Sequence, residues 1–275
     1  MHDEIKKGRV ILAGAGPGDP ELLTIKVARY LSSADVVLTD RLVSEEILSQ
    51  HCSKRTEIIH VGKQCSLGIS TPQQTINELI VHYALQGKLV VRLKGGDVSI
   101  FSNILDELQA LTENGITYEI IPGVTSALGA AAYSGIPLTA RGYSTSVRFL
   151  TFHKKQILTN EYWNELAKTN DTLVFYMSSE TLPLVVKNLT ERKVDSDKKL
   201  AVIEQATTPQ QVVHVSDLYE FETTLKDKKF ASPSLIIIGK VVNLHAEFSW
   251  VDNSELRENY FKPVGDGKLE VKMSA

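Results

Sequence analysis

Asp40 stands directly after an apolar run, Asp35–Thr39, that is typical of a buried β-strand. Catalytic groups of α/β proteins collect at the carboxyl ends of strands, and a carboxylate there can take up a proton. Asp40 is therefore a candidate general base. The alternative role is structural, because Asp40 could instead form an ion pair with Arg41 or Arg92.

Glycines mark three turns that also follow apolar runs, at residues 14–20, 94–97 and 122–126. In the first, GAGPGDP, Pro17 has no N–H to donate and the third glycine of a dinucleotide fingerprint is missing. In the second, KGGD, glycines allow a ligand to approach the backbone and Asp97 can accept a hydrogen bond from it. Each turn could equally be a plain connection, with Asp97 capping a helix that starts near Ser99.

Composition limits the classes of function. The chain has 275 residues, 43% of them hydrophobic, and a net charge of −3, so no overall basic field attracts nucleic acid or an acidic membrane. Its two cysteines, Cys52 and Cys65, form neither a disulfide framework nor a C-x-x-C metal motif. We expect a cytoplasmic protein, because the N-terminus lacks a signal-peptide pattern and runs such as 235–238 are too short to span a bilayer.

Strands and helices must alternate to position these turns. The first half predicts strands at 10–13, 35–39, 57–61, 88–93 and 118–121. Between them we expect a helix over 21–31 and another capped by Thr71, with Pro72 in its first position. Such alternation is typical of a mostly parallel α/β sheet, with all three turns at its carboxyl edge.

The second half predicts a further domain. Residues 135–142 are rich in Gly and Pro, which favours a domain junction. Denser strands follow at 147–152, 172–177, 200–204, 211–215 and 234–242. We expect an N-terminal α/β domain over 1–139, a mixed α/β domain over 140–246, and a mobile polar tail over 247–275.

Several motifs occur in one order along the chain: GAGPGDPELLT, TDRLVS, VGK, VVRLKGGD, IPGVTSA, YSGIPLT, VFYM and TPQQVVH. This constellation, from about Gly8 to Val242, resembles the tetrapyrrole methylase family. The resemblance implies two α/β domains with the active site in the cleft between them. It also implies a C-methyltransferase that methylates uroporphyrinogen III at C2 and C7 to give precorrin-2, for sirohaem or cobalamin synthesis.

The resemblance also implies partners for particular residues. S-adenosylmethionine would be the methyl donor, without a metal, and its contacts would be Pro17, Gly95, Gly96, Asp97, Ile100, Thr125, Ser126, Met177 and Ala206. Asp40 would accept the proton and Lys63 would donate one, although Lys63 could simply bind a substrate carboxylate. A homodimer is expected from the family alone.

A substrate with eight carboxylates requires local cations on a net acidic chain. The cations near expected strand ends or the junction are Arg41, Lys63, Arg92, Lys94, Arg141 and Arg148. Our candidates for substrate binding are Arg41, Arg92, Lys94 and Arg141.

The segment after Asp97 departs from the family pattern, which leaves other functions open. Val98 replaces a proline, and Asn103 to Leu105 replace an arginine and two glycines, so a substrate-binding arginine is missing and the segment should be more helical. The alternatives are a methylase of a later corrin precursor, a weakly catalytic tetrapyrrole-binding protein, and a nicotinamide-dependent oxidoreductase that uses the first glycine turn.

Overall fold

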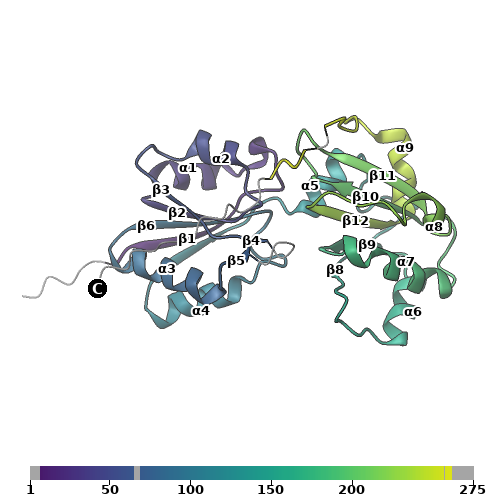
Figure 1. Cartoon of the computed structure of the whole chain (residues 1–275), viewed down its shortest axis with the longest axis horizontal. Helices are drawn as coiled ribbons and strands as arrows, with labels where there is room; N and C mark the ends of the chain where they lie inside the picture. Colours follow the sequence, from purple (N-terminus) through teal and green to yellow (C-terminus); the bar gives the residue numbers. More distant parts are fainter. Residues whose placement is uncertain (1–6, 65–68, 257, 262–275) are drawn as a thin grey trace, which may run out of the picture. The chain divides into compact units, whose positions relative to one another are not determined.

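The computed structural model describes residues 7–64, 69–256 and 258–261, with the backbone alone at 63, 64, 69 and 70. The chain separates into two compact units (Figure 1): one runs to Thr125 and takes in Phe261, and the other is Ser126–Tyr260. This division lies before the junction expected after Thr139, because helix α5 (Ser126–Tyr133) packs on strand β12 (Ser234–Gly239) of the second unit.

The first unit is a parallel α/β sheet, as predicted. Its elements are β1 (Arg9–Gly14), η1 (Pro20–Leu22), α1 (Ile25–Ser33), β2 (Val36–Thr39), α2 (Glu45–His51), β3 (Glu57–His60), β4 (Lys63–Gln64), β5 (Ile69–Ser70), α3 (Gln73–Leu85), β6 (Leu89–Lys94), α4 (Ile104–Glu113) and β7 (Thr117–Ile121). The strand order is β3-β2-β6-β1-β7, and all four neighbouring pairs are parallel.

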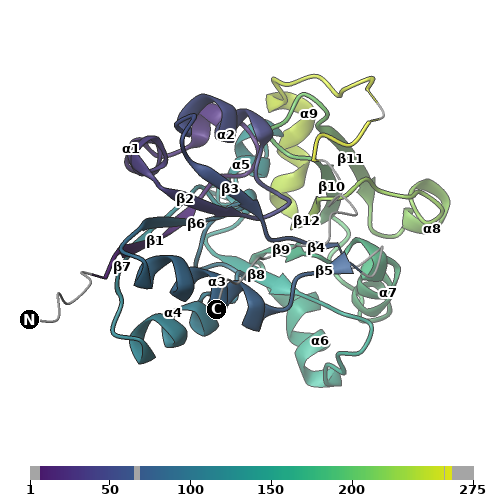
Figure 2. The same cartoon turned by 60° about the vertical axis from the view of Figure 1, so that its left-hand side comes forward.

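Helices cover both faces of this sheet, α1 and α2 on one and α3 and α4 on the other (Figures 1 and 2). Successive strand residues point to opposite faces, so each strand serves two cores. The core under α1 and α2 includes Ile11, Val37 and Val91, and the core under α3 and α4 includes Val10, Leu38 and Val90. This arrangement explains why the strands are nearly continuous apolar runs.

Two expected helix starts differ from the structure. The apolar stretch 21–31 is divided into η1 and α1, because the hydroxyl of Thr24 accepts from the N–H of Val27 at 3.3 Å and caps a new helix there. In α3, Pro72 takes the N-cap position that we expected for Thr71, and no side chain caps the helix. The short hairpin β4–β5 was not anticipated.

The second unit contains the mixed sheet that was expected. Its elements are α5, β8 (Val147–Thr151), α6 (Asn160–Lys168), β9 (Thr172–Tyr176), η3 (Ser179–Thr181), α7 (Leu182–Glu191), β10 (Lys199–Glu204), β11 (Val212–Asp217), α8 (Phe221–Thr224), β12, η4 (Lys240–Leu244) and α9 (His245–Phe248). The strand order is β11-β10-β12-β9-β8, and β8–β9 is the parallel pair among four. Helices α6 and α7 lie over one face (Figure 1).

The segment after α9 is held to the second unit, unlike the mobile tail that we expected. Trp250 Nε1 donates to the carbonyl of Ala132 at 2.8 Å. Asn253 accepts from the N–H of Val213 at 2.6 Å and donates to its carbonyl at 3.1 Å. Polar residues here serve as backbone partners, which composition alone does not reveal. Residues 262–275 lie outside the described residues.

Among the helices that the structure describes, none has the length and apolar character needed to cross a bilayer.

Candidate active site

The carboxyl ends of β1, β6 and β7 bring the three glycine turns of the first unit together. These strands are neighbours in the sheet, so the loops that follow them meet at one edge. Gly16 and Gly96 exchange backbone hydrogen bonds of 3.1 and 2.7 Å across two of the loops. The loops therefore support one another as a single backbone platform, in which Pro17 is buried and Gly95 and Gly96 are half-buried.

Glycine is required here by the loops themselves. A Cβ added to Gly14 would lie 2.6 Å from the carbonyl oxygen of Gly96, and one added to Gly123 would lie 2.3 Å from the same oxygen. Real Cβ atoms essentially never come within 3.0 Å of such an atom, so any side chain would force the loops apart. Close backbone packing thus accounts for these two glycines.

Asp97 joins two of the loops. Its carboxylate accepts from the N–H of Ser99 at 2.8 Å and from the N–H of Gly123 at 3.0 Å. Burial alone would raise the pKa of Asp97, but these bonds and the Ser99 hydroxyl hold its pKa below the ordinary value. The turn is closed in this way without a helix at Ser99, since α4 begins only at Ile104.

The segment between Asp97 and α4, which differs from the family pattern, is not helical, although we expected it to be more helical. Phe101 and Asn103 both adopt left-handed backbone conformations, with φ of 52° and 53°, and α4 starts after them. Val98 is buried, and Ile100 is half-buried in the same turn.

A buried cluster of charges lies beneath this platform. Arg92 and Lys94 are two residues apart on β6, so their side chains share one face of the sheet. Glu107, in the first turn of α4, accepts from Arg92 Nε at 3.0 Å and from Lys94 Nζ at 2.9 Å. Arg92 Nη2 in turn donates to Asp40 Oδ1 at 2.5 Å.

The substrate-binding roles expected for Arg92 and Lys94 do not fit this geometry. Both side chains are 3% exposed and both are paired with Glu107. Burial opposes the charge of Arg92, yet Asp40 and Glu107 raise its pKa above the ordinary value. For Lys94, burial outweighs the attraction of Glu107 and lowers its pKa. These cations are already neutralised inside the fold.

Asp40 is the part of the cluster that reaches solvent. Its side chain is 29% exposed, and no residue within the described ranges donates to its Oδ2. The expected ion pair with Arg92 is present, and one carboxylate oxygen is left able to accept a proton. Arg41 is half-buried beside it. Lys63 begins β4, but its side chain lies outside the described part of the chain.

In the second unit, two of the expected site residues, Met177 and Ala206, lie on loops that contain left-handed backbone. Met177 follows β9 with φ of 51° and a side chain 58% exposed. Ala206 follows β10 between Gln205 and Thr207, whose φ angles are 46° and 67°. Non-glycine residues adopt such angles at a cost that surrounding contacts must offset.

Side chains hold the second of these loops. Gln211 Oε1 accepts from the N–H of Thr207 at 2.8 Å, and Gln205 Oε1 accepts from the N–H of Tyr260 at 2.7 Å. At the junction, Thr125 is buried and Ser126 begins α5. Arg141 is exposed in the turn between α5 and β8.

Sequence reasoning missed Glu107, Gln205 and Gln211. Glu107 could have been found from its partners, because two basic residues on one face of a buried strand require a buried anion. The two glutamines give no such signal, since a polar residue beside a strand end is usually solvated.

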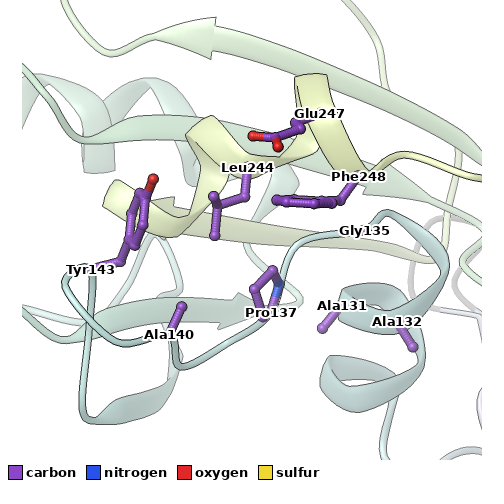
Figure 3. A pocket seen from close by; sticks show the side chains of 9 residues that line it. All are labelled: Ala131, Ala132, Gly135, Pro137, Ala140, Tyr143, Leu244, Glu247 and Phe248. Carbon is purple, nitrogen blue, oxygen red and sulfur yellow. The ribbon is translucent and has the colours of Figure 1, made fainter.

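A pocket of about 660 Å³ lies in the second unit, and none of the expected site residues is among its lining residues, although Ala140 and Tyr143 flank Arg141 in the chain. Figure 3 shows Leu244 and Phe248 on one wall and Pro137 on the other. Its lining is mainly apolar and its charged member is Glu247. A carboxylate and apolar walls do not suit a polyanionic substrate, so we do not place the active site there.

Comparisons with known proteins identify the family of this chain. The family described as Tetrapyrrole (Corrin/Porphyrin) Methylases matches residues 9–222. A uroporphyrinogen-III C-methyltransferase of Bacillus subtilis (strain 168) is 43% identical over 252 residues, which are 91% of this chain and 97% of that protein. A siroheme synthase of Vesicomyosocius okutanii is 42% identical over 90% of this chain and 53% of its own length. The chain thus spans about half the length of the siroheme synthases that it matches.

Solved structures give the same result. A uroporphyrin-III-C-methyltransferase from Thermus thermophilus, 34% identical, has a TM-score of 0.72 over 89% of this chain and 98% of its own. A structure of the Thermus thermophilus enzyme complexed with S-adenyl homocysteine has a TM-score of 0.71 over 86% of this chain and 100% of its own. A cobalt precorrin-4 methyltransferase, 25% identical, has a TM-score of 0.75 over 85% of this chain and 95% of its own. With a family match across most of its length, this chain belongs to the tetrapyrrole methylases.

Proposed function

We propose that this chain is an S-adenosylmethionine-dependent methyltransferase that converts uroporphyrinogen III to precorrin-2 by methylation at C2 and C7. The observation that carries this proposal is the match to the Bacillus subtilis enzyme, which extends over nearly the whole of both chains. The Thermus thermophilus relative crystallised with S-adenyl homocysteine supports the choice of methyl donor. The same family membership argues against the nicotinamide-dependent oxidoreductase.

The donor supplies a methyl group attached to a positively charged sulfur. Residues of this chain fit such a molecule, because glycine loops leave backbone N–H and C=O groups accessible and Met177 presents an exposed apolar side chain. We assign contacts with the donor to Pro17, Gly95, Gly96, Ile100, Thr125, Ser126, Met177 and Ala206. Asp97 keeps a role at this site as the residue that holds the loop, since its oxygens already accept backbone N–H groups.

Methyl transfer depends mainly on the alignment of the donor with the substrate carbon. A carbon of the substrate forms a bond to the methyl group as the bond from methyl to sulfur breaks, and a proton then leaves the macrocycle. The chain contributes by fixing the positions of the two molecules, and Asp40 takes up the proton at its exposed carboxylate. Lys63 would donate a proton or bind a substrate carboxylate.

Binding of the substrate carboxylates falls to Arg41 and Arg141, because Arg92 and Lys94 are buried. Arg141 is exposed and stands in a turn, where its guanidinium is able to reach an anionic ligand. We further propose a cytoplasmic homodimer whose product serves sirohaem or cobalamin synthesis. A methylase of a later corrin precursor is the second possibility, favoured by the TM-score of 0.75 to the cobalt precorrin-4 methyltransferase.

The test is incubation of the purified chain with uroporphyrinogen III and S-adenosylmethionine, followed by mass spectrometry. We expect a product that carries two added methyl groups. Asp40→Asn should lower turnover by roughly 100- to 10,000-fold, the usual contribution of a general base. Glu119→Gln, which alters a carboxylate at the sheet edge, serves as the control. Absence of methylated product from a folded chain would refute the proposed substrate.

A further inference from the structure

Glu107 is a buried carboxylate to which the proposed chemistry assigns no role. Its side chain is fully buried, and each of its oxygens accepts from a different cation, Arg92 and Lys94. It lies in the first turn of α4, where the helix dipole favours a negative charge. A carboxylate is costly to bury, and its retention here calls for a role beyond packing.

Arg92 connects this carboxylate to Asp40. Its guanidinium donates from Nε to Glu107 and from Nη2 to Asp40, on two sides of one rigid plane. Its Nη1 lies 3.3 Å from the carbonyl oxygen of Leu38 and 3.2 Å from that of Leu93. Four acceptors therefore orient the group, and Glu107 is the acceptor that holds Nε, so its loss would free one side of the plane that presents Nη2 to Asp40.

Charge balance gives Glu107 a second effect on Asp40. The cluster contains two cations and two anions, and Glu107 is the anion shared by both cations. Without its charge, Lys94 would keep no anionic partner except Asp40 among the residues that the structure describes, and Arg92 and Lys94 would repel each other. Within the described part of the chain, Glu107 thus leaves Asp40 paired with Arg92 alone and with an oxygen that can accept a proton.

We infer that Glu107 is a positioning residue for methyl transfer, which acts through Arg92 to hold the carboxylate of Asp40 toward the substrate. This inference rests on the proposed function of Asp40 as the base. Glu107 itself touches neither substrate nor donor in this assignment. It predicts that the energetic effects of Glu107 and Asp40 on turnover are coupled.

A double-mutant cycle tests the coupling. Glu107→Gln keeps the shape of the side chain and removes its charge. We expect kcat to fall roughly 10- to 100-fold, as for a displaced catalytic group, with KM for both substrates within about 2-fold. In the Asp40→Asn chain, the same Glu107→Gln change should lower kcat by less than about 2-fold, because the group it positions is gone. Single-turnover mass spectrometry measures methyl transfer for Glu107→Gln in the unmodified chain and in the Asp40→Asn chain.

Matched measurements separate this role from a general loss of structure. Glu119→Gln is the control variant, since Glu119 also accepts from two cations and a tyrosine in this unit but has no link to Asp40. Binding of S-adenosylhomocysteine, measured by titration calorimetry, should be unchanged by Glu107→Gln. If Glu107→Gln proves unstable, the charge-balanced pair Glu107→Gln with Lys94→Met replaces it in the cycle.

The outcomes distinguish the inference from the function on which it rests. If Asp40→Asn is slow and Glu107→Gln lowers kcat equally in both backgrounds, Glu107 does not act through Asp40 and the inference alone is wrong. If Asp40→Asn retains full turnover, the proposed base is wrong and the inference falls with it. Loss of kcat that disappears in the Asp40→Asn background supports both.

Discussion

The two units differ in how they build the turns that directly follow their strands. In the first unit, Gly14 and Gly123 allow backbones to pack so closely that no side chain fits. In the second, Met177, Gln205 and Thr207 keep their side chains although the backbone is left-handed. Glycine would relieve that strain, so the contacts of these side chains must offset it. The first unit therefore joins its loops through closely packed backbone, and the second keeps side chains at strained positions.

The largest expected effect on stability comes from removing a buried carboxylate near these loops, and it should differ between the two units. Glu107→Ala should lower the free energy of unfolding by about 3–5 kcal/mol, because it leaves two buried cations without their partner. Glu204, which ends β10 and lies 3.0 Å from His214 Nε2, is the counterpart in the second unit. Glu204→Ala should cost about 1 kcal/mol, the usual net value of the one side-chain hydrogen bond that it removes. Urea unfolding of both variants gives the comparison, and equal losses would contradict it.

The next effect tests close packing of the backbone. Gly123→Ala should lower the free energy of unfolding by about 3 kcal/mol, at the upper end for an overpacked site, because the clash is with a backbone oxygen. It should also weaken binding of S-adenosylhomocysteine. Gly142→Ala is the matched control, since a Cβ there meets nothing within 4 Å, although its φ of 84° gives some strain. A Gly123→Ala chain as stable as the control would show that the loops can separate freely.

Acid should loosen the first unit's loops through Asp97. Its pKa is lower in the folded chain than its ordinary value of 3.8. The carboxylate therefore adds stability above that value, and this contribution is lost as the pH falls through the lower, folded-state pKa. Asp97→Asn should cost about 1.5–2 kcal/mol at pH 7, as for hydrogen bonds to a charged group, and should flatten the fall in stability below pH 4. Unfolding curves between pH 2 and 7 check both, and an unchanged acid slope in Asp97→Asn would exclude Asp97 as the cause.

The smallest expected effect is a gain in stability, in contrast to the losses predicted above. Met177→Gly should stabilise the chain by about 0.5–1 kcal/mol, because glycine adopts the left-handed conformation without strain and the side chain is mostly exposed. It should nevertheless weaken binding of S-adenosylhomocysteine, because the apolar contact is lost. Thermal unfolding and calorimetry measure the two quantities. A variant that is more stable and binds equally well would remove Met177 from the site.

Much of the fold could be predicted from local pattern. Each predicted strand is present within a few residues, since apolar runs bounded by Gly, Pro or polar residues fix strands well. The boundary between units was misplaced because the small-residue helix α5 packs on β12, more than 90 residues later, and local sequence does not encode that choice. Thr24 was missed as a cap because it interrupts an otherwise continuous apolar face.

The candidate site was predicted in part. The meeting of the glycine turns follows from parallel topology, and the ion pair of Asp40 with Arg92 was one of two alternatives stated for that residue. The burial of Arg92 and Lys94 could not be foreseen, because their exposure depends on the position of Glu107 on α4. Charged residues on strands are usually solvated, so pattern alone predicts that both side chains are exposed.

Asn253 has a consequence for how the protein behaves at high concentration. Strand β11 is an edge of the second sheet, and Asn253 occupies both the N–H and the carbonyl of Val213 on that edge. An amide side chain there imitates one residue of a neighbouring strand. Because these two backbone groups are already hydrogen-bonded, another chain cannot pair with them and aggregate at this edge. A protein shortened before Asn253 should therefore lose solubility before it loses its fold.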